Sequence, residues 1–390
     1  MGRVRLLALC GALVFAAGCS DTSPVGPSAT ANDAKDNGLL TNEAWYGGAG
    51  PGAMPIRIYQ QNVYPGFDID SVAAGLVQSL ISSDPTPFFD SLAVGMATFD
   101  STNWRERAAR MVVEIQRQNP DVVSLNEMIT LDRKGLGLIG INVADGKTDF
   151  LGIFEEELAK RGLHYKLVDS LPLTDAFVPI DVIFLGLPFG TVYARYQDRD
   201  AMLVREEVGV ANVATDTFDV FLEQVLPQLR GWIAADLTVR GKTWRFVTSH
   251  PDPSWPANGK TPHVEQLIAS VANVTSPVII AGDLNLQPTW TEHQQLVDAG
   301  FVDLWTSRLG PAPSDNPNGF TCCELDPALR NPQPTLTKRI DYVMARPADG
   351  YRVGPVRFSI FGDDLAERTA TGMWSADHAG LLVGLVMQHK

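Results

Sequence analysis

The chain has 390 residues, of which 45% are hydrophobic and 19% are charged, so it can fill the core of one large domain or two ordinary ones. Its formal net charge of -14 argues against a broad basic surface for nucleic acid. A nuclease is not excluded, because a bound divalent cation can supply local positive charge at a phosphate.

Residues 1–19 have the composition of an export signal. Arg3 and Arg5 form a basic segment, residues 6–17 an apolar segment, and residues 16–19 a small-residue cleavage site that ends in Cys19. The apolar run is too short to span a bilayer comfortably, and no later run is long and apolar enough. The pattern resembles a bacterial lipoprotein signal, which implies export to the cell envelope and lipidation of Cys19. An ordinary secretory signal that is cut nearby is the alternative.

Small and polar residues, among them Pro24, Gly26 and Pro27, predict a flexible tether over residues 20–43. Loss of Arg3 and Arg5 with the signal would leave 29 basic against 45 acidic residues, a net charge near -16. The sequence after the tether shows no internal repeat and no domain boundary, so a single domain is expected over residues 44–390.

Alternating strand and helix patterns predict a layered α/β domain. Strands are expected over residues 56–59, 121–125, 164–168, 201–204, 233–239, 242–248, 278–281, 340–344 and 381–387. Helices are expected over residues 68–82, 103–118, 150–161 and 263–274, with another from Thr291. Residues 306–337 are expected to form a long irregular loop. Two long segments, 63–102 and the Pro/Gly-broken apolar stretch 171–193, could shape access to a site. The second segment could meet lipid, but buried packing is favoured.

Two adjacent cysteines, Cys322 and Cys323, remain after Cys10 is removed and Cys19 is lipidated. Their Cα atoms would lie about 3.8 Å apart across a trans peptide, which is below the usual disulfide range. The pair could be two free loop cysteines, a strained vicinal disulfide, or part of a metal site that no further cysteine completes.

Polar side chains stand at, in or just beyond six of the predicted strands. They are Asn62, Glu127, His250, Asp283 with Asn285, Asp341, and Asp377 with His378. Each alone could cap a turn or lie on the surface, but ligands bind at one end of the strands in α/β sheets. After the strand 278–281, alternation directs Asp283 and Asn285 to the same side. A carboxylate beside a carboxamide suits hydrolysis of a phosphate ester.

These residues lie in segments that resemble the endonuclease/exonuclease/phosphatase superfamily, the metal-dependent phosphoesterases that include pancreatic-type deoxyribonuclease, exonuclease III-type enzymes, bacterial sphingomyelinases and inositol polyphosphate 5-phosphatases. The segments occur in family order as QQNVY (60–64), DVVSLNE (121–127), TSHP (248–251), AGDLN (281–285), RIDYV (339–343) and SADH (375–378). The resemblance implies a four-layer α/β sandwich in which two packed mixed β-sheets are flanked by helices, with the site at one edge.

The resemblance also implies a metal site and a water-activating group. Glu127 would be the principal ligand of Mg²⁺, with Mn²⁺ as an alternative, and Asn62 and Asp377 would lie near the metal. Such hard oxygen ligands suit Mg²⁺. Asp283 would orient or deprotonate the attacking water, and Asn285 would hold a phosphate oxygen.

Two histidines complete the set that the resemblance implies. His378 would stabilise charge on the phosphorus centre, with Asp341 fixing its tautomer and favouring its protonated form. His250 would assist the phosphate or the leaving oxygen, and it resembles deoxyribonuclease-like and sphingomyelinase-like members rather than exonuclease III-type enzymes. A carboxylate should support His250, and Asp198 is the first choice, followed by Asp200.

The leading hypothesis is a lipid-anchored, Mg²⁺-dependent phosphodiesterase that uses in-line attack by an activated water. Its substrate would be a nucleic acid or a phospholipid or phosphosugar. We expect a monomer that meets the membrane only through its anchor. A non-catalytic surface binding module that retains the fold is the alternative. A thiol protein built on Cys322 and Cys323 is disfavoured, because the pair lacks a CxxC context.

Overall fold

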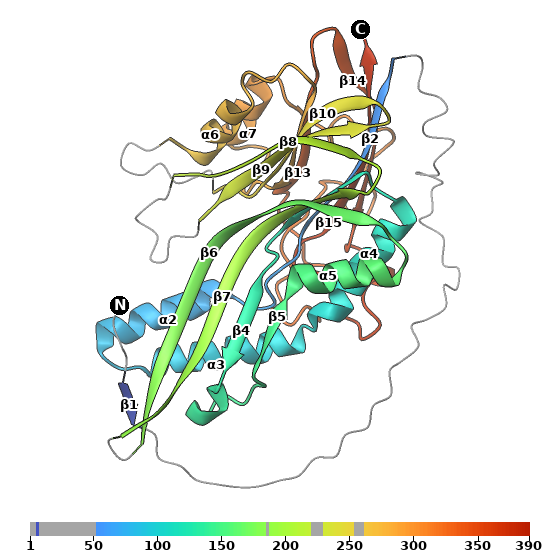
Figure 1. Cartoon of the computed structure of the whole chain (residues 1–390). Helices are drawn as coiled ribbons and strands as arrows, with labels where there is room; N and C mark the ends of the chain where they lie inside the picture. The colour runs from blue at the N-terminus through green and yellow to red at the C-terminus, as the bar shows by residue number, and fades with distance from the viewer. Residues whose placement is uncertain (1–4, 8–51, 185–186, 220–228, 253–260) are drawn as a thin grey trace.

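The computed structural model describes residues 5–7, 52–184, 187–219, 229–252 and 261–390 (Figure 1). The predicted tether, Cys19 and most of the predicted signal lie outside these residues. Within the signal only the short strand β1 (Arg5–Leu7) is described, and it pairs with β6. None of the described helices is both long and apolar enough to cross a bilayer.

Two mixed β-sheets form the centre of the fold (Figure 1). The larger sheet has the strand order β1-β6-β7-β3-β2-β15-β14, and β4 and β5 join it beside β7. Its other strands are β2 (Met54–Asn62), β3 (Val122–Asn126), β4 (Thr130–Lys134), β5 (Gly146–Asp149), β6 (Tyr165–Phe184), β7 (Leu187–Arg205), β14 (Tyr351–Phe361) and β15 (Gly380–His389).

The second sheet has the order β12-β13-β11-β10-β9-β8. Its strands are β8 (Gly209–Thr217), β9 (Gly231–Val239), β10 (Lys242–Ser249), β11 (Val278–Asp283), β12 (Val302–Asp303) and β13 (Asp341–Arg346). The pairs β2/β3 and β10/β11 are parallel. Their carboxyl ends therefore bring polar residues to one edge.

Helices flank both sheets and complete four layers. The larger sheet is covered by α2 (Ile69–Ser82), α3 (Thr86–Ser101), α4 (Trp104–Gln118) and α5 (Phe150–Lys160). The second sheet is covered by α6 (His263–Ser270) and α7 (Thr291–Asp298). Alternation along β11 shows the layering, because Ile279 and Ala281 pack between the sheets whereas Val278 and Ile280 pack toward α6 and α7. The predicted α/β sandwich is confirmed.

The apolar segment over residues 171–193 forms most of a long hairpin of β6 and β7 (Figure 1). Ala176 and Val178 of this hairpin pack against Ile69, Val72 and Leu76 of α2 in one core cluster. Parts of the two long segments, 63–102 and 171–193, therefore cover each other. Ala176 and Val178 are partly buried in this contact, whereas Phe177 between them is 54% exposed.

Several elements differ from the sequence prediction. The strand expected over residues 164–168 is the start of the much longer β6, and the helix expected over 263–274 ends at Ser270. β8 was not predicted, because it is an edge strand with mainly exposed side chains and has no apolar period. β14, β4 and β5 were also missed, since their residues are only partly buried or mix polar with apolar types.

A single buried side chain holds both ends of the segment between β2 and α4. Arg107 of α4 donates from Nη1 to Val63 O at 2.6 Å, from Nη2 to Tyr64 O at 3.1 Å and from Nε to Thr102 O at 2.9 Å. Nη1 also donates to Ser375 O at 3.0 Å. Burial lowers the pKa of Arg107 to about 10, so the guanidinium stays charged at neutral pH. It joins the chain beyond Asn62 to the chain before Asp377.

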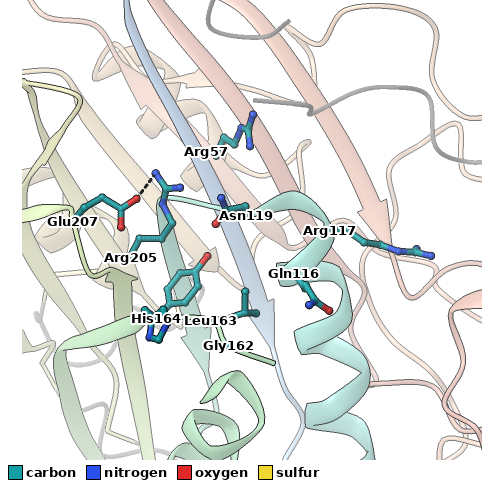
Figure 2. A pocket seen from close by; sticks show the side chains of 10 residues that line it. Arg57, Gln116, Arg117, Asn119, Gly162, Leu163, His164, Arg205 and Glu207 are labelled. Atoms are coloured by element: carbon teal, nitrogen blue, oxygen red, sulfur yellow. Dashed lines mark ion pairs between the residues drawn. The ribbon is translucent and has the colours of Figure 1, made fainter. Parts of the chain in front are cut away.

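At the opposite end of β2 and β3, arginines from several elements gather with a few acids (Figure 2). A cavity of about 570 Å³ is lined there by Arg57, Arg117, Arg205 and His164, among others. Buried Asp121 accepts from Arg205 Nη2 at 2.7 Å and from Arg240 Nη1 at 3.0 Å. This end of the sheet is therefore a structural charge cluster, well separated along the strands from the acidic end.

Close approach of two strands requires glycine at position 282. A Cβ atom built on Gly282 would lie 1.8 Å from Ser249 O, a backbone atom that cannot move aside without parting β10 from β11. Gly137, in contrast, has nothing within 4 Å of such an atom. The Gly-Asp pair at the end of β11 is thus dictated by packing as well as by chemistry.

We expect Gly282→Ala to lower the free energy of unfolding by about 1–3 kcal/mol, because the added methyl overpacks the junction of the strands. Gly137→Ala is the matched control and should leave the unfolding transition unchanged. Urea denaturation of the two variants beside the wild type measures the difference. Equal stability of both variants would contradict the tight packing at Ser249.

Candidate active site

Polar residues converge where the parallel strands of both sheets end. Asn62 ends β2 and is in register with Asn126 at the end of β3, and Asp283 ends β11 in register with Asp341 at the start of β13. Asn126 Oδ1 accepts a hydrogen bond from Asp283 N at 3.0 Å, which joins the two sheets. The predicted gathering of strand-end residues at one edge is present in the structure.

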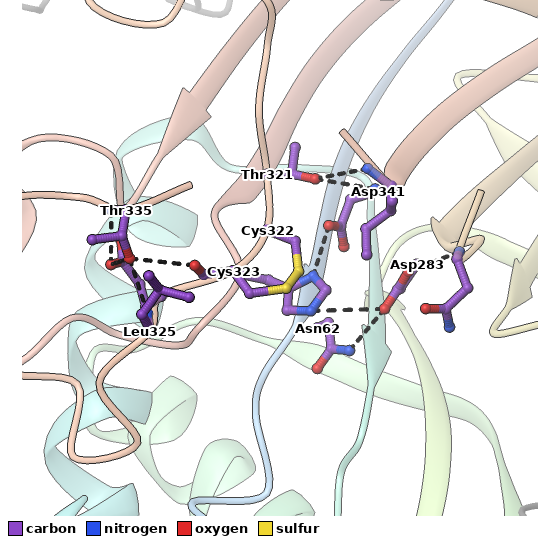
Figure 3. The surroundings of a disulfide bond; sticks show 12 residues. Asn62, Asp283, Thr321, Cys322, Cys323, Leu325, Thr335 and Asp341 are labelled. Atoms are coloured by element: carbon purple, nitrogen blue, oxygen red, sulfur yellow. Dashed lines mark hydrogen bonds and ion pairs between the residues drawn. A yellow bond between two sulfur atoms is a disulfide. The ribbon is translucent and has the colours of Figure 1, made fainter. Parts of the chain in front are cut away.

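The carboxylate of Asp283 lies at the centre of this group (Figure 3). Its Oδ2 accepts from Asn62 Nδ2 at 3.1 Å and lies 3.5 Å from His250 Nε2 and 3.8 Å from His378 Nε2. Its Oδ1 accepts from the backbone N of Asn285 at 2.9 Å. Burial raises the pKa of Asp283 to about 6, although the charge of His378 opposes the rise. The carboxylate can therefore exchange a proton near neutral pH.

His378 is held as a cation by Asp341. Its Nδ1 lies 2.8 Å from Asp341 Oδ2, and Asp341 Oδ1 accepts from Gln60 Nε2 at 3.1 Å. Burial works against the charged ring, but the carboxylates of Asp341, Asp377 and Asp283 raise the pKa of His378 well above its ordinary value. Asp341 thus lies where the expected support of His378 places it, and Nε2 is left to donate into the site.

His250 has the opposite charge state. Burial and then the charge of Arg230 lower its pKa well below the ordinary value, so the ring is neutral. Its Nδ1 lies 2.8 Å from Arg230 Nη1. A guanidinium only donates, so Nδ1 must be the acceptor and Nε2 must carry the proton. That proton faces Asp283.

The structure corrects the expected support of His250 by Asp198. Asp200 Oδ1 is the carboxylate oxygen near the ring, 3.9 Å from His250 Nδ1, whereas Asp198 Oδ2 lies 3.9 Å from Arg230 Nη1. Alternate side chains of β7 point to one face, and both aspartates are buried there. Both distances exceed a hydrogen bond, so Arg230 is the direct partner of His250 Nδ1, and Asp198 lies behind this arginine.

Sequence reasoning missed Arg230. It precedes β9, and β9 runs antiparallel to β10, so the amino end of one strand lies beside the carboxyl end of the other. His250 N donates to Gly231 O at 3.3 Å across this pairing. An arginine directly before a buried strand of a predicted hairpin was the available signal, but only acids, amides and histidines were sought at strand ends.

Excess negative charge gathers around Glu127 and Asp377. Burial, then Asp377 and Asp198, raise the pKa of Glu127 to about 8. Burial also raises the pKa of Asp377, whose buried Oδ1 has no hydrogen-bond partner among the described residues. An unpartnered carboxylate oxygen beside a second carboxylate is what a hard cation needs, so Glu127 and Asp377 fit a Mg²⁺ or Mn²⁺ ion.

The two predicted amides have different contacts. Asn62 is engaged on both ends, because its Nδ2 donates to Asp283 and its Oδ1 accepts from Tyr64 N at 3.1 Å. Asn285 is in the left-handed region at φ 53°, and its Nδ2 donates to Pro251 O at 3.3 Å. Asn62 thus orients the carboxylate of Asp283 directly, whereas Asn285 lies at the start of the loop that follows β11.

Solved structures with related folds come from several organisms. An endonuclease/exonuclease/phosphatase family protein from Leptotrichia buccalis has 14% identity and a TM-score of 0.47, covering 86% of this chain and 99% of that one. A protein of the same description from Beutenbergia cavernae has 17% identity and a TM-score of 0.48, with 86% and 72% coverage. TDP2 from D. rerio, complexed with single strand DNA product, has 18% identity and a TM-score of 0.44, with 86% and 99% coverage.

No curated protein has a sequence that matches this chain. The model of the Endonuclease/Exonuclease/phosphatase family, however, matches residues 94–378. That span is most of the chain, and within it lie β3, β10, β11 and β13, whose ends carry Glu127, His250, Asp283 and Asp341. Together with the two packed sheets and the polar cluster at their edge, this match shows that the chain belongs to the endonuclease/exonuclease/phosphatase family.

Proposed function

We propose that the protein is a metal-dependent phosphodiesterase that hydrolyses its substrate by in-line attack of an activated water. One observation carries the proposal. A buried carboxylate, Asp283, lies within 3.8 Å of two imidazoles, one neutral and one cationic. This arrangement pairs a proton acceptor with a proton donor at one point, as hydrolysis of a phosphate ester requires.

Each residue has a part in the proposed reaction. Asp283 takes the proton of the attacking water, and Asn62 holds the carboxylate in place for that transfer. His378 donates from Nε2 to a phosphoryl oxygen as negative charge builds up, while Asp341 keeps the ring charged. His250 donates from Nε2 toward the phosphate or the leaving oxygen, and Asn285 holds a phosphate oxygen.

Mg²⁺ or Mn²⁺, when bound, would neutralise phosphate charge and polarise the phosphoryl group. Glu127 and Asp377 would hold it, with Asn62 nearby. Burial raises the pKa values of both carboxyl groups, and the charge of Asp377 adds to the rise at Glu127, so a bound cation would favour their charged forms.

The substrate is a nucleic acid or a phospholipid or phosphosugar. The net charge of -14 favours the second class slightly, because a nuclease usually has more basic surface. A non-catalytic binding module would not need two histidines in opposite charge states. The presence of all the predicted polar residues at the strand ends also argues against that alternative. From the sequence we further propose export, an anchor at Cys19 and a monomeric enzyme.

Asp283→Asn should reduce turnover of bis(p-nitrophenyl) phosphate by about 10²–10⁴-fold, because the amide cannot accept the proton of water. Asp298→Asn, at an exposed position on α7, is the matched control and should keep full activity. Turnover is followed with Mg²⁺, Mn²⁺ or EDTA, then on plasmid DNA and sphingomyelin, which separate the two substrate classes. Folded wild type that turns over nothing would favour the binding module.

Mg²⁺ binding should release about one proton per ion at pH 7, because Glu127, with a pKa of about 8, must lose its proton to become a ligand. Affinity should therefore increase as the pH rises toward 8. Calorimetry in two buffers of different ionisation enthalpy measures the released proton. Glu127→Gln should abolish the release and Glu292→Gln on α7 should preserve it; release that survives in Glu127→Gln would exclude this ligand.

Arg230→Gln should move the acid limb of the pH–rate profile to higher pH. The guanidinium lowers the pKa of His250, so its removal lets the ring protonate at a higher pH, and a charged ring would pair with Asp283. Arg230→Lys keeps the positive charge and should keep the limb near its original position. If both variants show the wild-type profile, Arg230 does not set the charge state of His250.

A further inference from the structure

The loop with Cys322 and Cys323 is bound to the segment that carries His378. Cys322 and His378 are opposite each other in an antiparallel bridge. On either side, Ala379 N donates to Thr321 O at 2.7 Å and Glu324 N donates to Asp377 O at 2.8 Å. Backbone bonds on both flanks therefore hold the two sulfur atoms beside the imidazole, independently of any bond between the sulfurs.

Figure 3 draws the surroundings of the disulfide, which include Asn62, Asp283 and Asp341 of the candidate active site. The two Sγ atoms and one ring nitrogen of His378 all lie within 4.8 Å of one another. Cys322 is buried and Cys323 is partly exposed, so small solutes can reach the pair from one side. In the structure the sulfurs are joined as a disulfide, and neither can then serve as a thiolate ligand.

We propose that reduction of Cys322–Cys323 creates a binding site for a thiophilic divalent cation such as Zn²⁺, with His378 as the third ligand. A dithiol reductant gives two electrons and two protons to the disulfide and is itself oxidised to a disulfide. The cation then displaces the two thiol protons. Two thiolates and an imidazole leave one coordination position open, as in zinc sites with three protein ligands.

The surroundings of His378 suit this role. Nδ1 already lies 2.8 Å from Asp341 Oδ2, so Nε2 is the nitrogen that would face the cation. A carboxylate on the far nitrogen of a ligating histidine fixes its tautomer and strengthens it as a ligand. The sulfur and imidazole set also differs in kind from the oxygen set of Glu127 and Asp377, so Mg²⁺ should not compete for it.

Occupation of this site would remove His378 from the reaction. Nε2 cannot both bind a cation and donate to a phosphoryl oxygen, so the loaded protein should be inactive. This consequence rests on the proposed function, whereas the binding of the cation does not. The active site would then respond to thiophilic metals only in its reduced form.

The binding test uses Co²⁺, whose thiolate complexes absorb through ligand-to-metal charge transfer. The purified protein is reduced with a dithiol, freed of reductant without oxygen and titrated with Co²⁺. We expect the absorption for one ion per chain in the reduced wild type and none in the oxidised protein or the Cys322→Ser/Cys323→Ser variant. His378→Asn keeps both thiols and should bind at least about tenfold more weakly. Equal binding by His378→Asn, or no absorption in the reduced wild type, would overturn the site.

The activity test separates this inference from the proposed function. Turnover of bis(p-nitrophenyl) phosphate with Mg²⁺ is first measured without Zn²⁺ in the reduced wild type and in the Cys322→Ser/Cys323→Ser variant, and inhibition is expressed relative to each protein's own rate. Zn²⁺ should inhibit the reduced wild type at concentrations at least about tenfold lower than the variant. Equal inhibition of both would overturn the inhibitory role. Co²⁺ binding without turnover in any form would reject the phosphodiesterase and leave the cation site standing.

Discussion

The neutralisation of buried carboxylates at one edge of the sheets is the constraint on which the rest of the structure depends. Asp283 has no solvent to stabilise its charge, so an amide, a backbone N–H and two imidazoles surround it. These partners come from β2, the loop after β11, the end of β10 and the start of β15. The pairing of both sheets must therefore be correct before this carboxylate is satisfied.

The same constraint divides the two histidines into different states. Asp341 faces His378 and charges it, whereas Arg230 faces His250 and keeps it neutral. Each partner is buried and is itself held, Asp341 by Gln60 and Arg230 by a further carboxylate at Asp252. Two histidines at one edge of the sheets thus acquire opposite charge states from the buried side chains that they contact.

The sequence was sufficient to predict strands and their polar end residues where a local apolar pattern coincides with burial. The apolar strands that end in Glu127, His250 and Asp283 have short β-branched runs, and their polar ends are readable. It was insufficient where a residue reaches the site through its pairing with an adjacent strand. Arg230 reaches the site because β9 is antiparallel to β10, and Asp198 approaches His250 through this arginine, which no local pattern in β7 indicates. The hairpin of β6 and β7 was unreadable because its partner, α2, lies far away in sequence.

Arg107 closes the segment between β2 and α4 at its base, since Val63 and Tyr64 at one end and Thr102 at the other bind one guanidinium. The residues between them, which include α2 and α3, therefore begin and end at one fixed point. Changes within α2 and α3 that leave Val63, Tyr64 and Thr102 in place keep these bonds to Arg107 and the path of the chain that leads from Asn62. The bonds to one guanidinium thus allow this segment to vary in sequence while the polar groups at the end of β2 keep their positions.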